Sequence, residues 1–125
     1  MKSLLVYFVF ILIGVSEASC QIITTYGGTG AADWGGDGLP AATAEIGTPF
    51  GLNFGNNGDL LVSAGMLVRS IDKISTIVTR IAGSDTASGG PTGWGNGGPA
   101  TCASVLRGNQ TVQDENGNYY IVDSW

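Results

Sequence analysis

Histidine is absent from the sequence of 125 residues, and charged residues make up only 12% of it. Without histidine the chain lacks the commonest general base and the commonest zinc ligand, which argues against most hydrolytic and zinc chemistry. Five basic residues stand against ten acidic ones, the formal net charge is −5, and no segment collects the basic residues. Because binding to a phosphate backbone needs a dense positive footprint, we do not expect nucleic acid or an anionic membrane surface as a partner.

The N-terminus differs in composition from the rest of the chain. Residues 1–20 combine Lys2, an apolar stretch from Leu4 to Val15 and small residues that end at Cys20. This order is typical of a secretory signal peptide, so we expect a secreted, extracellular protein. The apolar stretch is shorter than the roughly 20 residues that a membrane-spanning helix needs, so we expect no stable membrane insertion after cleavage. Anchoring by an uncleaved N-terminal segment is the alternative.

Cysteine is scarce, with Cys20 and Cys102 as its two copies. Export favours disulfides, but Cys20 lies in the predicted signal peptide or at the extreme N-terminus after cleavage, which leaves Cys102 without a partner in this sequence. We therefore interpret Cys102 as a small buried residue. A disulfide to an absent part of the chain is the alternative.

Glycine is abundant, with 21 copies, which excludes helix bundles and is typical of all-β folds with many turns. The segment GDGLPAATAE at 36–45 returns as GNGGPATCAS at 95–104, a separation of 59 residues. IITTYGG at 22–28 returns as IVTRIAG at 77–83, a separation of 55. This self-similarity indicates a repeat architecture, in which one supersecondary unit cannot bury its own apolar face.

Short apolar runs separated by turn residues predict four antiparallel strands and the start of a second set. The predicted strands are Phe50–Phe54, Leu60–Ala64, Met66–Ile71 and Thr76–Ala82, followed by Thr111–Gln113 and Tyr119–Asp123. Four strands per repeat, with a long loop between repeats, favour a propeller blade over a sandwich. We predict an all-β fold: a partial β-propeller with about one complete four-stranded blade plus parts of two others, after a helical signal peptide.

The predicted propeller part spans residues 21–125. It is divided into an outer strand at 22–28, an inter-blade loop at 29–49, a blade at 50–83, a second inter-blade loop at 84–109 and the start of the next blade at 110–125. A propeller ring needs roughly four to eight blades, and two apolar sheet faces would otherwise stay exposed. We therefore expect the N-terminal portion of a longer propeller.

The order of these segments resembles a known family. PFGLNFGNNGDLLVSAGMLVRSID followed by ISTIVTRIAG is similar to an NHL-repeat β-propeller blade, and WGNGGPATCAS leading to ENGNYYIVDSW is similar to the next one. The resemblance covers residues 22–125. Gly108 and Gln110 stand where the first copy has Pro49 and Gly51, which loosens the match at the entry of a strand. Some relatives implied by the resemblance are secreted lyases that use metal-bound histidines, which this sequence lacks.

The duplicated loops hold the candidate binding residues. Trp34 and Trp94 take matching places, where a ring can stack on a sugar, anchor a protein partner or pack over its own loop. Asp37 and Asn96 each close an Asx-type turn before a proline that starts a short helical turn, which we expect to run from Ala41 to Ile46 in the first loop. The duplication is explained by this turn geometry without any chemistry.

Two further kinds of site are considered, a calcium site formed by carboxylates and a glycosylation sequon. Carboxylates of the kind that calcium binds gather in the loops, but turn and capping roles explain them, and we expect no metal and no cofactor. These carboxylates are Asp33, Asp37, Glu45 and Asp85. The sequon at Asn109 is a glycosylation candidate in an exported chain, with a polar strand entry as the alternative.

The sequence shows no pair of catalytic carboxylates, no nucleophile beside a base and no phosphate-binding loop with a lysine. The predicted function is therefore a secreted NHL-repeat-like binding or scaffold module that contacts protein or glycan through one propeller face, and not an enzyme. One alternative is the N-terminal piece of a secreted propeller enzyme whose catalytic residues lie in missing blades. Another is a gene fragment without a function.

Overall fold

The computed structural model describes residues 21–85 and 95–124 and places six strands in them. β1 to β4 are Pro49–Phe54, Leu60–Ala64, Leu67–Ile71 and Val78–Gly83, and β5 and β6 are Gly108–Gln113 and Tyr119–Asp123. The predicted β-rich class is confirmed for this part of the chain. The predicted signal peptide at 1–20 and Trp94 lie outside the described residues.

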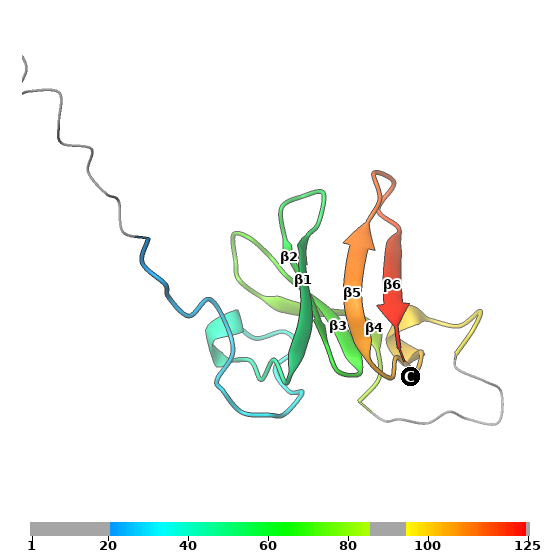
Figure 1. The fold of residues 1–125 in the computed structure, drawn as a ribbon, viewed down its shortest axis with the longest axis horizontal. Helices are drawn as coiled ribbons and strands as arrows, with labels where there is room; N and C mark the ends of the chain where they lie inside the picture. The colour runs from blue at the N-terminus through cyan, green and yellow to red at the C-terminus, as the bar shows by residue number, and fades with distance from the viewer. Residues whose placement is uncertain (1–20, 86–94, 125) are drawn as a thin grey trace, which may run out of the picture.

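β1 to β4 form one antiparallel sheet in chain order (Figure 1). The turn between β1 and β2 is closed by the N–H of Gly55, which donates to the carbonyl of Asp59 at 2.8 Å. Gly58 in this turn has a φ of 86°, a conformation that glycine adopts without steric penalty. All four strands of this sheet lie within two residues of their predicted bounds.

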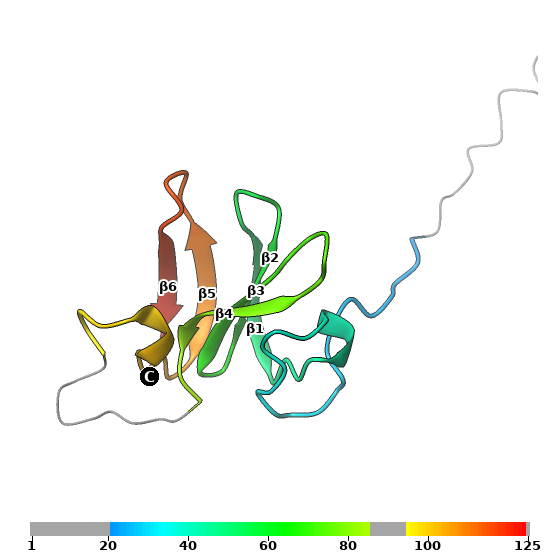
Figure 2. The same ribbon diagram turned by 180° about the vertical axis from the view of Figure 1, so that it is seen from behind.

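β5 and β6 form a two-stranded antiparallel hairpin beside the first sheet. β5 begins at Gly108, three residues before its predicted start. β5 stands next to β1, and the two strands run in the same direction (Figure 1). The long loops at 29–48 and 95–107 lie at one end of the strands, the loop end, and the turns at 55–59 and 114–118 lie at the other, the turn end (Figures 1 and 2).

The two copies of the sequence repeat have the same backbone conformation. Gly36 and Gly95 have φ values of 97° and 93°, and Gly38 and Gly97 have values of 84° and 79°. A three-residue 3-10 turn follows in both loops, at Ala41–Thr43 and Ala100–Cys102. β1 and β5 also carry the same irregularity of pairing after their first residue, at 49–51 and 108–110. Positions separated by 59 residues are therefore structurally equivalent.

The pairing register assigns the side chains of the first sheet to two faces. The Leu52 face includes Leu52, Phe54, Leu60, Val62, Arg69, Ile71, Val78 and Arg80, and the Ser63 face includes Gly51, Asn53, Leu61, Ser63 and Val68. The loop at 34–48 covers part of the Leu52 face, where Ala41 and Ala44 pack with the buried aliphatic residues of the sheet. This cluster is the core between the first loop and the first sheet.

The hairpin covers the Ser63 face. The hydroxyls of Ser63 and Thr111 are 2.8 Å apart in a buried contact, and the side-chain amide of Asn53 donates to the carbonyl of Thr111 at 3.1 Å. Gly51 lies against the backbone of Asn109, where no side chain fits. Hydrogen bonds and close backbone contact thus join one repeat to the next.

The structure differs from the sequence-based expectations at three places. Residues 22–28 form no strand in the described chain, and Ile22 and Ile23 are 87% and 98% exposed. A strand needs a neighbouring strand to pair with, and among the described residues the backbone of this segment is bonded only at Gly28, whose N–H donates to the carbonyl of Ala41 at 2.8 Å. The helical turn expected up to Ile46 ends at Thr43. Cys102 is a free, exposed thiol and not a buried residue, because the short turn directs it to solvent, as it does the equivalent Thr43.

The described residues contain no helix of the length and apolar character that crossing a bilayer requires.

Candidate functional site

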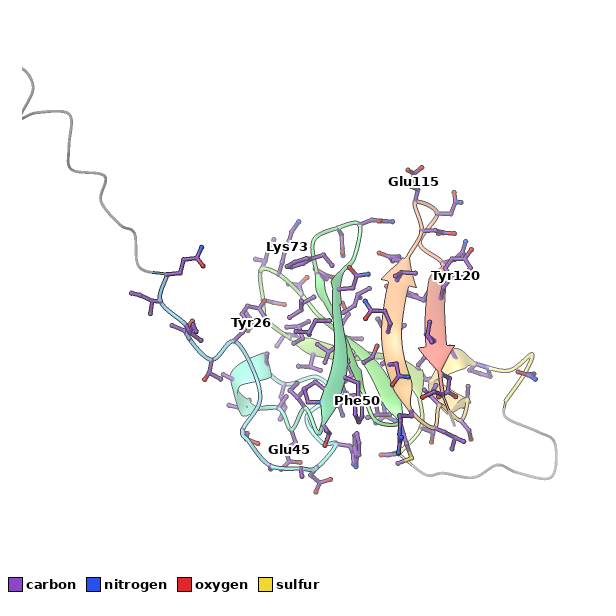
Figure 3. All side chains as sticks on the ribbon, viewed as in Figure 1. Tyr26, Glu45, Phe50, Lys73, Glu115 and Tyr120 are labelled. Carbon is purple, nitrogen blue, oxygen red and sulfur yellow. The ribbon has the colours of Figure 1, made fainter. Side chains whose placement is uncertain are left out.

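The loop end of the first sheet holds a hollow lined mainly by polar residues and glycines. It has a volume of about 560 Å³ and is lined by Asp33, Trp34, Gly35, Gly36, Asp37, Glu45, Arg80 and Asp85. The loop at 33–45 supplies most of this lining, and β4 supplies Arg80. Glu45 marks this end in Figure 3. The hollow therefore includes five of the residues singled out from the sequence, which are Trp34 and the carboxylates Asp33, Asp37, Glu45 and Asp85.

Asp37 connects the loop to two arginines of the sheet. Arg69 on β3 and Arg80 on β4 are register partners and lie side by side on the Leu52 face. The two carboxylate oxygens of Asp37 lie 2.9 Å from the Nε of Arg69 and 2.8 Å from the Nε of Arg80. Two like charges on neighbouring strands repel each other, and the carboxylate between them offsets that repulsion. Both carboxylate oxygens of Asp37 thus face arginines and not a backbone N–H as in the predicted Asx-type turn, and the turn is closed by the N–H of Leu39, which donates to the carbonyl of Gly36 at 3.0 Å.

Arg69 is buried, with 1% of its side chain exposed. Its Nη1 donates to the carbonyl of Glu45 at 2.8 Å, and its Nη2 donates to the carbonyl of Trp34. Its Nε–H does not point at the Asp37 oxygen, so that contact is an ion pair and not an aligned hydrogen bond. Burial lowers the pKa of Arg69, and the charge of Asp37 counteracts this effect. Arg69 therefore fastens both ends of the loop to β3.

Arg80 is more accessible, with 23% of its side chain exposed, and also pairs with Asp85 at 3.5 Å. Burial acts to lower its pKa, but the hydrogen bond and charge of Asp37 outweigh that effect and raise the pKa of Arg80. The sequence pattern does not mark either arginine as a site residue, because the basic residues are scattered singly along the chain. An arginine within the apolar run MLVRSI was the available signal, since a buried arginine needs partners.

Trp34 packs over its own loop. Its ring lies against Gly47 and Gly65, so closely that a Cβ at Gly65 would stand 2.0 Å from the ring. The side chain is half-buried and joins the edge of the core. These contacts support the packing interpretation of Trp34. The ring also forms one wall of the hollow.

The second loop repeats the turn without the ion pair. Asn96 is exposed and lies in the turn between Gly95 and Gly98, whose backbone hydrogen bond measures 3.1 Å. Its neutral amide stands where the first loop has the carboxylate of Asp37. The hairpin β5–β6 brings no third or fourth strand with it, so the described residues contain no equivalent of the Arg69 and Arg80 pair in this repeat.

The carboxylates of the first loop line the same hollow but face different partners. Asp33 accepts a hydrogen bond from the N–H of Trp34 at 2.8 Å, and Asp37 faces the two arginines. Among residues 21–85 and 95–124, no three histidine, cysteine, aspartate or glutamate side chains are placed to hold a metal ion.

Asn109 lies in β5, with its amide donating to the hydroxyl of Ser124 at 2.8 Å. The third residue of the sequon, Thr111, is 2% exposed and bonded to Ser63. A glycosylating enzyme must reach both residues, so a glycan at Asn109 would have to be attached before the hairpin packs against the first sheet.

Two aspartates at the turn end act as local caps. Asp72 accepts hydrogen bonds from the N–H groups of Ile74 and Ser75 and from the Ser75 hydroxyl, at 3.0, 2.6 and 2.8 Å. Asp114 accepts from both nitrogens of Asn118 and from the Tyr120 hydroxyl. The backbone bond from Ser75 lowers the pKa of Asp72 most, and the side-chain bond from Asn118 lowers the pKa of Asp114 most.

These lowered pKa values predict a loss of stability in acid. Each carboxyl has a lower pKa in the folded chain than in the unfolded chain, so each stabilises the fold above about pH 4 and loses that effect as the pH falls further. We expect the thermal midpoint to drop between about pH 5 and pH 3, and to drop less in Asp72→Asn than in the wild type. Circular dichroism melts across this range measure it, and equal pH dependence in the two proteins would contradict the assigned cap.

A scan against protein-family models finds no family that matches this chain, and a search of curated proteins finds no match either.

Proposed function

We propose that the chain is part of a secreted NHL-repeat-like β-propeller that acts as a binding or scaffold module and contacts protein or glycan through its loop end. The observation that carries this proposal is the packing of the second hairpin on the Ser63 face of a four-stranded meander, with β1 and β5 side by side. Radial stacking of such sheets, with inner strands adjacent, is the arrangement of a propeller.

The loop end is the better binding surface of the two ends. Loops carried on a rigid sheet are the usual place for binding residues, and Arg69 and Trp34 hold this loop firmly against the sheet. The hollow of about 560 Å³ offers carboxylates, backbone groups and an aromatic wall. These groups suit a partner that presents hydroxyl or amide donors.

Binding assays with loop-end and turn-end variants test the proposal. The purified protein is screened on a glycan array and against extracellular proteins, and bound partners are then measured by calorimetry with Asp33→Asn and Glu45→Gln at the loop end. These substitutions, at the exposed Asp33 and the half-buried Glu45, should weaken binding by about tenfold each, because a hydrogen bond to a charged group contributes about 1.5 kcal/mol or more.

Lys73→Met and Glu115→Gln are the matched controls, because both residues lie at the turn end (Figure 3). Neither should change the affinity by more than about twofold. Equal losses at the two ends, or losses at the turn end alone, would refute the assignment of the loop end.

A further inference from the structure

The contact between the two repeats shows how a sheet of this kind packs on its neighbour, and so what the uncovered part of the first sheet can bind. The hairpin face that carries Thr111 packs on the Ser63 face of the first sheet. By the 59-residue equivalence, Thr111 corresponds to Leu52 and Gln113 to Phe54. The Leu52 face is therefore the equivalent of a surface that is covered in the second repeat.

In the first repeat the β1 edge of this face is uncovered, while the rest of the face is buried under the first loop. Leu52 and Phe54 are 60% and 71% exposed, whereas Thr111 is 2% exposed. A groove of about 240 Å³ lies between this face and residues 25–27, and its sheet side is lined by Leu52, Leu60, Val62 and Ile71. An apolar surface of this kind on a repeat unit requires a neighbouring sheet.

The opposite surface of the hairpin is uncovered as well. Val112, Tyr120 and Val122 on this surface are 43%, 57% and 59% exposed. They are equivalent to Asn53, Leu61 and Ser63 of the Ser63 face. Figure 3 shows Tyr120 on the side of the hairpin away from β1. The chain thus carries both halves of a head-to-tail interface, one at each end of the stack, which would allow copies to associate in a row.

One residue of the hairpin differs from the contact inside the chain. In the contact inside the chain, a Cβ at Gly51 would stand 2.1 Å from the carbonyl oxygen of Asn109 and 3.2 Å from the Cα of Gln110. Only a glycine permits this approach of the two backbones. The equivalent of Gly51 in the hairpin is Gln110, which follows the same strand irregularity and has a Cβ.

We propose that the Leu52 face receives another β-sheet of the same repeat kind with a glycine at the place of Gly51, and that Gln110 prevents a second copy of this chain from serving as that sheet. The partner sheet would make the same contact with β1 of this chain that the first sheet makes with β5. This inference rests on the proposed stacking of repeat units but not on any ligand, so the binding assays and the following test can fail separately.

Gln110→Gly in the purified protein tests the proposal, because it gives the hairpin the glycine that the contact requires. Gln110 is exposed, and its amide lies 3.5 Å from the Leu52 carbonyl, so its removal should leave the fold intact by circular dichroism. We expect sedimentation to show a monomeric wild type and a Gln110→Gly variant whose average mass rises with concentration to about twice the monomer mass or more.

Gln110→Ala is the matched control, because it removes the same polar group but keeps the Cβ, and it should stay monomeric. The double variant Gln110→Gly with Leu52→Asp should return to a monomer, since a charge on the receiving face opposes docking. A monomeric Gln110→Gly variant, a self-associating wild type or Gln110→Ala variant, or association that survives Leu52→Asp would each overturn the proposal.

Discussion

Gly51→Ala is expected to lower the free energy of unfolding by about 3 kcal/mol, the upper end of the usual range for overpacking a close contact. The added methyl would stand 2.1 Å from the Asn109 oxygen and 3.0 Å from its carbonyl carbon. Both are backbone atoms of β5, so relief requires a shift of the whole strand. The buried bond between Ser63 and Thr111 lies in the same contact and would be strained or lost.

Urea unfolding measures the change, and hydrogen exchange of the β5 amides shows whether the hairpin has come away from the first sheet. Gly98→Ala is the control: this glycine is exposed, its φ is not in the left-handed region, and its nearest neighbour is a backbone oxygen at 3.3 Å. It should change stability by no more than about 0.5 kcal/mol. Wild-type stability and wild-type exchange in Gly51→Ala would rule out the close approach.

Asp37→Asn is expected to destabilise the chain by about 2 kcal/mol, because it leaves the charge of Arg69 buried and beside Arg80 without a carboxylate. The full cost of breaking a buried pair is about 3–5 kcal/mol, and the lower value applies here because 29% of the Asp37 side chain is exposed. Asp33→Asn, in the same loop, faces no arginine in the structure and should stay within about 0.5 kcal/mol.

A double-mutant cycle separates the ion pair from the packing of the loop. Arg69→Met removes the buried charge but also the donors to Glu45 and Trp34, so it is destabilising by itself. In the double variant, Asp37→Asn should cost at least about 1 kcal/mol less than it does in the wild type. Strict additivity of the two changes would show that Asp37 and Arg69 do not stabilise each other.

Much of the fold could be predicted from short-range patterns. Alternating apolar residues and the turn at Asn57-Gly58 set β1 and β2, and the duplicated glycines set the two loops, whose φ values repeat within a few degrees. The segment at 22–28 shows the limit of such patterns. Its sequence matches that of β4, but β4 pairs with the strand β3, and 22–28 pairs with no strand among the described residues.

The candidate site was predictable in part. Trp34 and Asp37 could be singled out because the loop that holds them is duplicated. Their roles could not, because each depends on residues that lie far away in the sequence: Gly65 for the ring, and Arg69 and Arg80 for the carboxylate. Equivalent positions also take different roles, since Asn96 has no charge to pair.

The sequence by itself determined the strand periodicity, the turns and the doubled loop, because these depend on the φ preference of glycine and proline and on the alternation of neighbouring side chains. Tertiary structure alone decided that Arg69 is buried, that Trp34 closes over Gly65 and that Gly51 admits the backbone of Asn109. Those contacts join residues from 31 to 58 positions apart, and desolvation and steric fit at such separations leave no periodic trace in the chain.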